Sequence, residues 1–170
     1  MYAGGMVRIV LVLLLGASAW FAPSLARAQT CVVFDTAIAF GAFDPTAGAA
    51  KTGQGTVQVG CRSSRVAVTI TLGTGQSLSY ANRVMTSTGG GSLTYNLYTA
   101  ATLGTVWGDG IAAGTGSVQC TTGNDGPGEC TGKPGMFFTA TYPVYGQINA
   151  VQPNAAVGSY TDDVVVTMIF

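Results

Sequence analysis

The sequence predicts an all-β protein in which two sheets pack face to face. Three observations favour this class. Only 8% of the 170 residues are charged and 25 are glycine, which is typical of strands joined by many tight turns. Several runs alternate apolar and polar residues with a period of two, the pattern of half-buried strands. Turn residues separate these runs, and a chain of this length forms one domain.

The first three strands are expected at residues 31–40, 55–61 and 66–72. The first is stopped by Asp44-Pro45 and the small residues that follow. The second places valines at alternate positions. The third shows the cleanest alternation in the chain, because valine, isoleucine and leucine alternate with alanine and threonine, and glycines end it.

The last three strands are expected at residues 93–99, 137–148 and 160–170. A short piece around Arg83-Val84-Met85 precedes them, and a loop with two cysteines, in which no strand is predicted, interrupts them. Pro143 splits the second of these strands. It indicates a bulge or an edge position, since proline has no N–H group to donate to a central ladder.

The last strand drives the functional interpretation. One of its faces carries Val164, Val166, Met168 and Phe170, and the other carries Val165, Thr167 and Ile169. The sequence ends at Phe170 without a closing turn. Because an open apolar edge invites aggregation, we expect this strand to receive its neighbour from another molecule. The expected fold is an incomplete immunoglobulin-like β-sandwich of six strands, which lacks the last strand and is completed by a donor strand from a partner.

Residues 1–28 are predicted to be a secretory signal peptide, which leaves residues 29–170 as the mature domain. Arg8 precedes an apolar stretch, and small residues follow that stretch. Two cleavage sites remain open, one after Ala28, which we favour, and one after Ala19. An uncleaved membrane anchor is disfavoured, because the apolar run is shorter than the roughly 20 residues that span a bilayer.

Export favours disulfide bonds between the four cysteines, Cys31, Cys61, Cys120 and Cys130. Three pairings are possible. A Cys31–Cys61 bond would tie two strands together, and a Cys120–Cys130 bond would then close a small loop. A zinc site is the competing interpretation, but the spacings do not match paired zinc ligands and the chain has no histidine.

No catalytic or cofactor site is predicted. Without histidine, a Ser-His-Asp or Cys-His arrangement is impossible. The triple glycine Gly89–Gly91 has no lysine beside it and is interpreted as a turn rather than a phosphate loop. Asp109, between glycines, is expected to cap its own turn rather than bind calcium, which needs six to eight oxygen ligands. Asp162 and Asp163 are expected to be a solvated strand start.

Aromatic residues and net charge bear on the choice of partners. A sugar-stacking surface could be built from the ring side chains Trp107, Tyr95, Tyr98, Tyr142 and Tyr145, although packing within the sheets is the favoured interpretation. The formal net charge is zero, so neither nucleic acid nor an anionic membrane surface is indicated as a partner, and no stable membrane insertion is expected.

Four motifs, in this order and spacing, closely resemble the spore coat protein U domain family, which includes subunits of Csu-type archaic chaperone–usher pili. They are Leu93–Tyr98, Val106–Gly110, Val144–Ile148 and Gly158–Asp162. The resemblance covers essentially the whole mature chain. It also places Cys31 and Cys61 at the positions of the family's disulfide between its first two strands, whereas Cys120 and Cys130 look like an addition.

The resemblance implies a function in fibre assembly. Subunits of this family leave a hydrophobic groove beside their last strand, which a periplasmic pilus chaperone fills first. At the outer-membrane usher, the N-terminal extension of another pilus subunit replaces the chaperone. The groove residues expected here are Val164, Val166, Met168 and Phe170.

The function expected from the resemblance is that of an exported structural subunit of a chaperone–usher pilus or fimbria. The chain would be secreted through the periplasm to a cell-surface fibre, for surface adhesion and biofilm formation. Two alternatives stay open, a tip adhesin with a ligand-binding surface and a spore-coat-type extracellular structural protein. An enzyme is not expected.

The cleavage site bears on the position in such a fibre. A cut after Ala28 leaves only Gln29 and Thr30 before Cys31, and these two residues reach less than about 10 Å. Such a subunit could accept a donor strand but could not supply one. A cut after Ala19 would leave residues 20–30, about 36 Å when extended, which is long enough for a donor strand.

Overall fold

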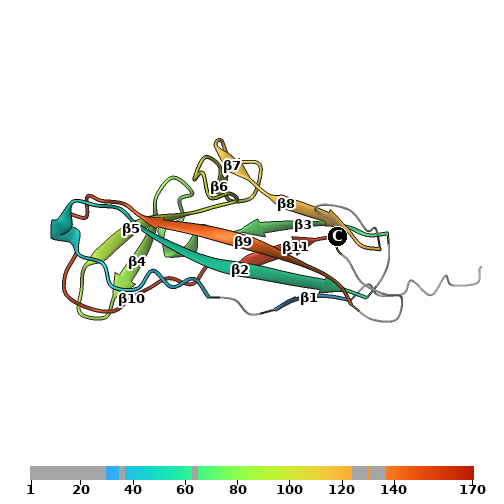
Figure 1. Ribbon diagram of the computed structural model, residues 1–170, viewed down its shortest axis with the longest axis horizontal. Coiled ribbons are helices and arrows are strands. Elements are labelled where there is room, and N and C mark those ends of the chain that lie inside the picture. Colours follow the sequence, from blue (N-terminus) through green and yellow to red (C-terminus); the bar gives the residue numbers. More distant parts are fainter. Residues whose placement is uncertain (1–29, 35–36, 63–64, 124–129, 131–136) are drawn as a thin grey trace, which may run out of the picture.

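The computed structural model describes residues 30–34, 37–62, 65–123, 130 and 137–170. Two sheets form a long, narrow sandwich, in which all strand pairs but one are antiparallel (Figure 1). The predicted all-β, immunoglobulin-like sandwich is confirmed. The predicted signal peptide and both cleavage sites lie outside the described residues.

The larger sheet contains the longest strands, β2 and β9, at its centre. In spatial order its strands are β1 (Cys31–Phe34), β2 (Lys51–Cys61), β9 (Phe138–Ile148), β5 (Ser92–Tyr98), β4 (Arg83–Ser87) and β10 (Tyr160–Thr161). Off this path, β6 (Val106–Trp107) pairs with β5, and β7 (Thr115–Gly116) pairs with β6. The strands β2 and β9 pair without a break along their whole length, from Lys51 opposite Ile148 to Cys61 opposite Phe138.

The smaller sheet has three strands. Their order is β11 (Val166–Ile169), β3 (Ala67–Leu72) and β8 (Val118–Thr121). Two 3₁₀ turns, η1 (Pro45–Ala47) and η2 (Gly75–Ser77), are the only helical elements of the described residues. No helix in the described part of the chain has the length and the apolar character that crossing a membrane requires.

The predicted strand at residues 160–170 is divided between the two sheets. Tyr160 and Thr161 form β10 and pair with β4 in the larger sheet, whereas Val166–Ile169 form β11 and pair with β3 in the smaller one. The residues between them cross from one sheet to the other. The prediction of one continuous strand is therefore wrong, because alternation reports which side chains are buried and does not report which sheet buries them.

Other strand boundaries also differ from the prediction. β8 occupies part of the cysteine loop, where no strand was expected, and β2 begins at Lys51 rather than Gly55. Within the predicted strand 31–40, only Cys31–Phe34 form a ladder with β2, and Ala39 adds an isolated bridge to Gln54. The polar and glycine-rich start of β2 has little intrinsic strand preference, so pairing with β9 determines its conformation.

The prediction that Pro143 splits its strand is wrong, because β9 runs without a break from Phe138 to Ile148. The predicted edge position holds only on the side of β9 that faces β5. On one side it is opposite Thr56 of β2, and on the other side β9 pairs with β5 only from Tyr145 to Ile148. The missing N–H group of proline therefore costs no ladder bond with β5.

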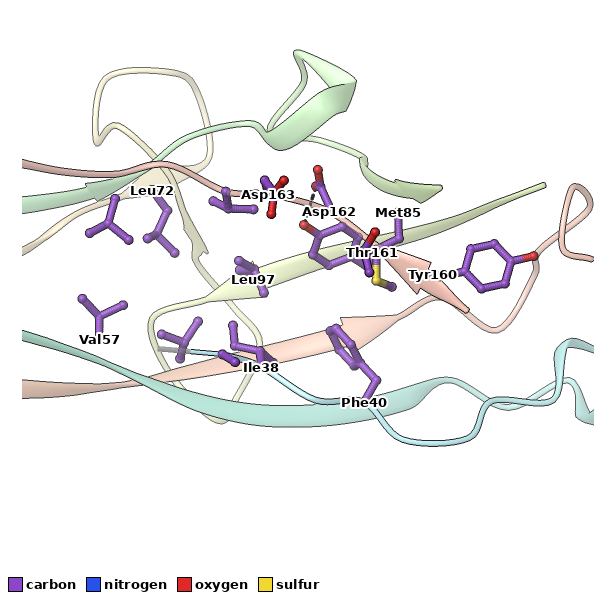
Figure 2. A pocket seen from close by; sticks show the side chains of 15 residues that line it. Ile38, Phe40, Val57, Leu72, Met85, Leu97, Tyr160, Thr161, Asp162 and Asp163 are labelled. Carbon is purple, nitrogen blue, oxygen red and sulfur yellow. Dashed lines mark hydrogen bonds between the residues drawn. The ribbon is translucent and has the colours of Figure 1, made fainter. Parts of the chain in front are cut away.

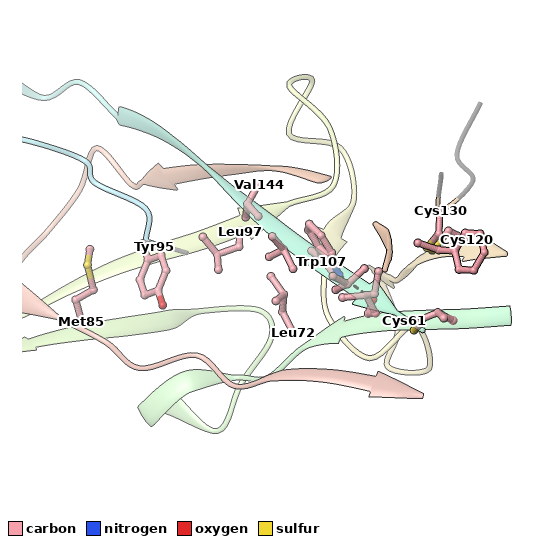
Figure 3. Close-up of a cluster of buried hydrophobic side chains, with 14 of the residues drawn as sticks. Cys61, Leu72, Met85, Tyr95, Leu97, Trp107, Cys120, Cys130 and Val144 are labelled. Carbon is pink, nitrogen blue, oxygen red and sulfur yellow. Dashed lines mark hydrogen bonds between the residues drawn. A yellow bond between two sulfur atoms is a disulfide. The ribbon is translucent and has the colours of Figure 1, made fainter. Parts of the chain in front are cut away.

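The core fills the space between the two sheets (Figure 3). Alternate residues of β2 and β9 meet those of β3, and each of the following is at most 2% exposed: Val57, Val59, Val68, Ile70, Leu72, Val144 and Ile148. Trp107 is fully buried, and its indole N–H group donates a hydrogen bond of 3.1 Å to the carbonyl oxygen of Ile70. Burying these side chains is the main source of stability, since each contributes roughly 1.5–3 kcal/mol.

Both predicted disulfide bonds are confirmed. Cys31 and Cys61 lie directly opposite each other on β1 and β2 and are bonded. Cys120 of β8 is bonded to Cys130, whose side chain is fully buried. The loop enclosed by the second bond lies largely outside the described residues.

Candidate functional site: a groove between two sheet edges

Two sheet edges are free on the same side of the sandwich. Within the described residues, β1 pairs only with β2, and β11 pairs only with β3. The strands β1 and β11 approach each other but share no ladder. Backbone N–H and C=O groups along such edges are available for pairing with another strand.

A hollow lies between residues 37–45, which follow β1 in the chain, and residues 155–166, which lead into β11. One part, of about 430 Å³, separates the segment at residues 37–40 from the segment at residues 160–166. A second part, of about 790 Å³, continues between residues 38–45 and residues 155–160. The two parts share four lining residues, Ile38, Phe40, Met85 and Tyr160. We call the two parts together the edge groove.

The floor of the edge groove is apolar and comes from both sheets. It consists of the core side chains Val57, Leu72, Met85, Tyr95, Leu97 and Val144. Figure 2 shows Ile38 and Phe40 on one side of this floor and the polar residues Thr161, Asp162 and Asp163 on the other. The groove therefore offers an apolar depression with one acidic wall.

The wall formed by residues 37–40 rests on glycines of the larger sheet. A Cβ atom built on Gly55 would lie 2.6 Å from Ile38 Cγ1, and one built on Gly146 would lie 2.6 Å from Phe40 Cζ. A Cβ atom on Gly53 would lie 2.9 Å from Phe40 Cδ1. Because real Cβ atoms do not approach so closely, glycine at these positions lets Ile38 and Phe40 lie directly on the sheet.

The opposite wall is held by hydrogen bonds to Gly73 just after β3, to the η2 turn and to β5. The N–H group of Gly73 donates to Val165 O at 2.8 Å. Asp162 accepts from Gln76 N at 3.0 Å through Oδ1 and from the Tyr95 hydroxyl at 2.6 Å through Oδ2. Burial, and then the hydrogen bond to Asp162, raise the pKa of Tyr95 well above its usual range, so this hydroxyl stays protonated and donates.

The predicted groove residues occupy different places. Val164 and Val166 line the edge groove, and Met168 packs against the core beyond it. Phe170 follows the end of β11 and is 55% exposed. The outward residues Val165 and Ile169 are 68% and 59% exposed, so the predicted alternation of faces holds from Val164 to Ile169.

Several groove residues were not singled out from the sequence. Ile38 and Phe40 were expected only in a strand, and Tyr160 and Met85 were not considered as lining residues. Asp162 was expected to be solvated, and that expectation is wrong, because the carboxylate is partly buried and accepts two hydrogen bonds. The sequence did contain one signal, because Tyr95 occupies an alternate, core-facing position of β5 and its buried hydroxyl needs an acceptor. The sequence does not show that this acceptor is Asp162.

The other candidate residues do not form a ligand site. Asp109 Oδ1 accepts from Ile111 N, Ala112 N and Thr115 Oγ1, which confirms the expected self-capped turn. Trp107 is fully buried, so it cannot contribute to the sugar-stacking surface considered above.

The tyrosines of that surface are divided between the core and the surface. Tyr95 is 4% exposed, and Tyr142 packs edge-on against the Trp107 ring. Tyr98 and Tyr145 lie opposite each other across β5 and β9 and are half-buried. The interpretation that all five rings form one sugar-stacking surface is therefore wrong.

The comparison with protein families identifies the chain. The family model described as Spore Coat Protein U domain matches residues 17–167. The chain belongs to the Spore Coat Protein U domain family. The match covers every strand of the structure except the last residues of β11, so the edge groove is part of the Spore Coat Protein U domain.

A solved structure that is similar to this chain belongs to a chaperone–tip adhesin complex studied in CFA/I fimbriae biogenesis. The two chains are 14% identical with a TM-score of 0.32. The comparison covers 79% of this chain and 42% of the other, so this chain spans less than half the length of its neighbour. No curated protein sequence matches this chain significantly.

Proposed function

We propose that this Spore Coat Protein U domain protein is an exported structural subunit of a chaperone–usher pilus, which accepts a β-strand from a partner. The observation that carries the proposal is the edge groove, an apolar hollow between residues 37–40 and residues 160–166 that reaches the free edge of β11 at Val166. An inserted strand could pair with a free edge through its backbone while alternate side chains enter the hollow. The first partner would be a periplasmic chaperone, and the next would be another subunit at the outer-membrane usher.

The stability of the isolated chain tests this proposal. We expect the exported protein alone to aggregate or unfold readily, because an empty apolar groove leaves a flat sheet edge exposed. The same chain with an alternating valine–threonine strand joined after Phe170 by a flexible linker should stay monomeric and unfold at a clearly higher temperature. Calorimetry and light scattering measure both properties. An unmodified chain that is monomeric and as stable as the extended one contradicts the proposal.

A matched pair of variants tests where the strand binds. Val166 lines the edge groove, whereas its neighbour Val165 points outward and is 68% exposed. In the strand-extended protein, Val166→Asp should abolish the gain in stability, because a buried unpaired charge costs several kcal/mol. Val165→Asp should leave most of the gain. Equal effects of the two variants would place the added strand elsewhere.

The biological role within the proposal is surface attachment and biofilm formation. Deletion of the gene should remove surface fibres visible by electron microscopy and reduce the biomass that adheres to a solid surface. Restoring the gene with Val165→Asp should restore the fibres, and restoring it with Val166→Asp should not. Finding the protein in the coat of resting cells, with no fibre lost on deletion, would favour the coat role.

A further inference from the structure

Asp162 occupies the point where the chain leaves the larger sheet. It follows β10 directly, and β11 begins four residues later in the smaller sheet. Its carboxylate accepts one hydrogen bond from Gln76 N in the η2 turn and one from the hydroxyl of Tyr95 in β5. The crossing is thereby fixed to an element on each side of it.

The η2 turn packs closely against this carboxylate. Gly75 has a φ of +66°, and a Cβ atom at this position would collide with Asp162 Oδ2. Glycine is therefore required twice here, once for the left-handed backbone and once for the approach of the carboxylate.

The link continues from Asp162 across the floor of the edge groove to the opposite wall. The ring of Tyr95 packs edge-on against that of Phe40, with centroids 5.9 Å apart and an interplanar angle of 72°. Phe40 lines both parts of the groove. Asp162, Tyr95 and Phe40 thus connect one wall to the other through one hydrogen bond and one ring contact. We call these three residues the cross-groove brace.

The brace opposes a physical tendency of the empty groove. The apolar side chains of the two walls, such as Ile38, Phe40 and Val164, lower the free energy when they approach each other and exclude water. Tyr95 lies between Asp162 and Phe40, so the 160–166 wall cannot move straight toward residues 37–40 without pressing against it. A sideways shift of the wall would leave the buried Tyr95 hydroxyl without its acceptor, and a buried donor without a partner is costly. A carboxylate makes this acceptor strong, because charge-assisted hydrogen bonds exceed neutral ones.

We propose that Asp162 is a positioning residue that, through the cross-groove brace, keeps the edge groove open for an incoming strand. This inference rests on the proposed function of the groove. If the groove is open in only a fraction of the molecules, the apparent affinity for the strand is reduced by that fraction. The reduction appears as a slower association rate. Asp162 then affects the rate at which a strand binds rather than the rate at which a bound strand dissociates.

Strand-capture kinetics test the role of Asp162. The exported protein is refolded at low concentration and mixed with a fluorescein-labelled synthetic peptide of alternating valine and threonine, about ten residues long. Fluorescence anisotropy gives the association and dissociation rates. We expect Asp162→Ala to slow association about tenfold, as for one charge-assisted hydrogen bond, and to leave dissociation within about twofold of the unmodified protein. The isosteric Asp162→Asn should fall between the two.

Two controls match the test variants. Asp109→Asn removes the charge of an aspartate that lines neither part of the groove and caps its own turn, and it should leave both rates unchanged. Tyr95→Phe keeps the ring against Phe40 but removes the hydroxyl, so it should reproduce the slow association of Asp162→Ala. Its control, Tyr98→Phe, alters a half-buried tyrosine of the same strand. If Asp162→Ala does not fold, Tyr95→Phe carries the test.

The outcomes separate the two proposals. Equal association rates for Asp162→Ala and Asp109→Asn overturn the positioning role, and so does a change confined to the dissociation rate, while the proposed function still stands. If the unmodified protein captures no strand, from either the peptide or the linker-joined extension, the proposed function fails and the role of Asp162 fails with it.

Discussion

The guanidinium group of Arg83 donates two hydrogen bonds, of 3.0 and 2.7 Å, to the carbonyl oxygen of Gly73. Its remaining N–H groups reach Asn96 Oδ1 at 2.6 Å and Trp107 O at 2.7 Å. The side chain is fully buried, and burial lowers its pKa. This buried cation therefore joins β4 of the larger sheet to the end of β3 in the smaller sheet through neutral oxygen acceptors.

Arg83→Met should destabilise the strand-extended protein by about 3 kcal/mol or more, because several buried acceptors lose their donors at once. Arg83→Lys should recover only part of this loss, since one ammonium group cannot reach acceptors on three segments. Urea unfolding followed by the fluorescence of the buried Trp107 measures the change. As a control, Arg62→Met removes an exposed arginine that lies over the Phe137 ring, and it should cost about 1 kcal/mol or less. A similar loss for both variants would contradict the role of Arg83 in joining the sheets.

The two disulfide bonds should differ in their contribution to stability. Cys31–Cys61 closes a separation of 30 residues and Cys120–Cys130 one of 10, for which chain entropy gives about 3.6 and about 2.7 kcal/mol. Replacing Cys31 and Cys61 by serine should therefore lower the unfolding midpoint more than replacing Cys120 and Cys130. Peptide mapping without reduction checks the pairing first. The reverse order of midpoints would show that the second loop is tied to the core more strongly than its length implies.

The glycines beneath the 37–40 wall should not tolerate a side chain. Gly55→Ala places a Cβ atom 2.6 Å from both Ala37 O and Ile38 Cγ1, so the wall must move away from β2. Such overpacking costs typically about 1–3 kcal/mol, and strand capture should weaken as the groove changes shape. Gly89→Ala is the control, because its nearest neighbour, Ser87 Oγ, would be 3.8 Å away. Equal stability of the two variants would show that residues 37–40 do not pack on Gly55.

The turn at Asp109 should loosen in acid. Backbone hydrogen bonds from Ala112 and Ile111 lower the pKa of Asp109. A lowered pKa in the folded state means that the carboxylate stabilises the turn above about pH 4, the ordinary aspartate value, and that this contribution is lost as the pH falls through the lower folded value. NMR amide shifts of Ile111 and Ala112 should show the transition. Asp109→Asn keeps an acceptor but has no charge to lose, so the same step in this variant would assign the transition to another group.

The sequence predicts the strands where one face is buried along the whole element. Residues 66–72 alternate cleanly because β3 meets the core on one side only, and the predicted element is almost the observed one. The 160–170 segment alternates just as well, yet it is divided between two sheets. Side-chain burial has the same period in either sheet, so the crossing at Asp162 could be found only from the tertiary structure.

The candidate site was predicted in part for the same reason. The inward side chains Val164 and Val166 follow from periodicity on one strand. The opposite wall comes from residues 37–40, more than a hundred positions earlier in the chain, and only the sandwich brings the two together. Arg83 illustrates the limit of composition, because a buried arginine is rare and its acceptors are mostly backbone carbonyls, which any residue could supply.

The bond between Cys31 and Cys61 has a mechanical consequence. It ties β1, an edge strand of four residues, to β2, which has eleven. Under tension, the hydrogen bonds of a short edge strand can open one after another, so the strand peels from its sheet, whereas a covalent crosslink does not open in this way. A pulling force on β1 is therefore transmitted into the long ladder of β2 and β9, where many bonds bear the load together.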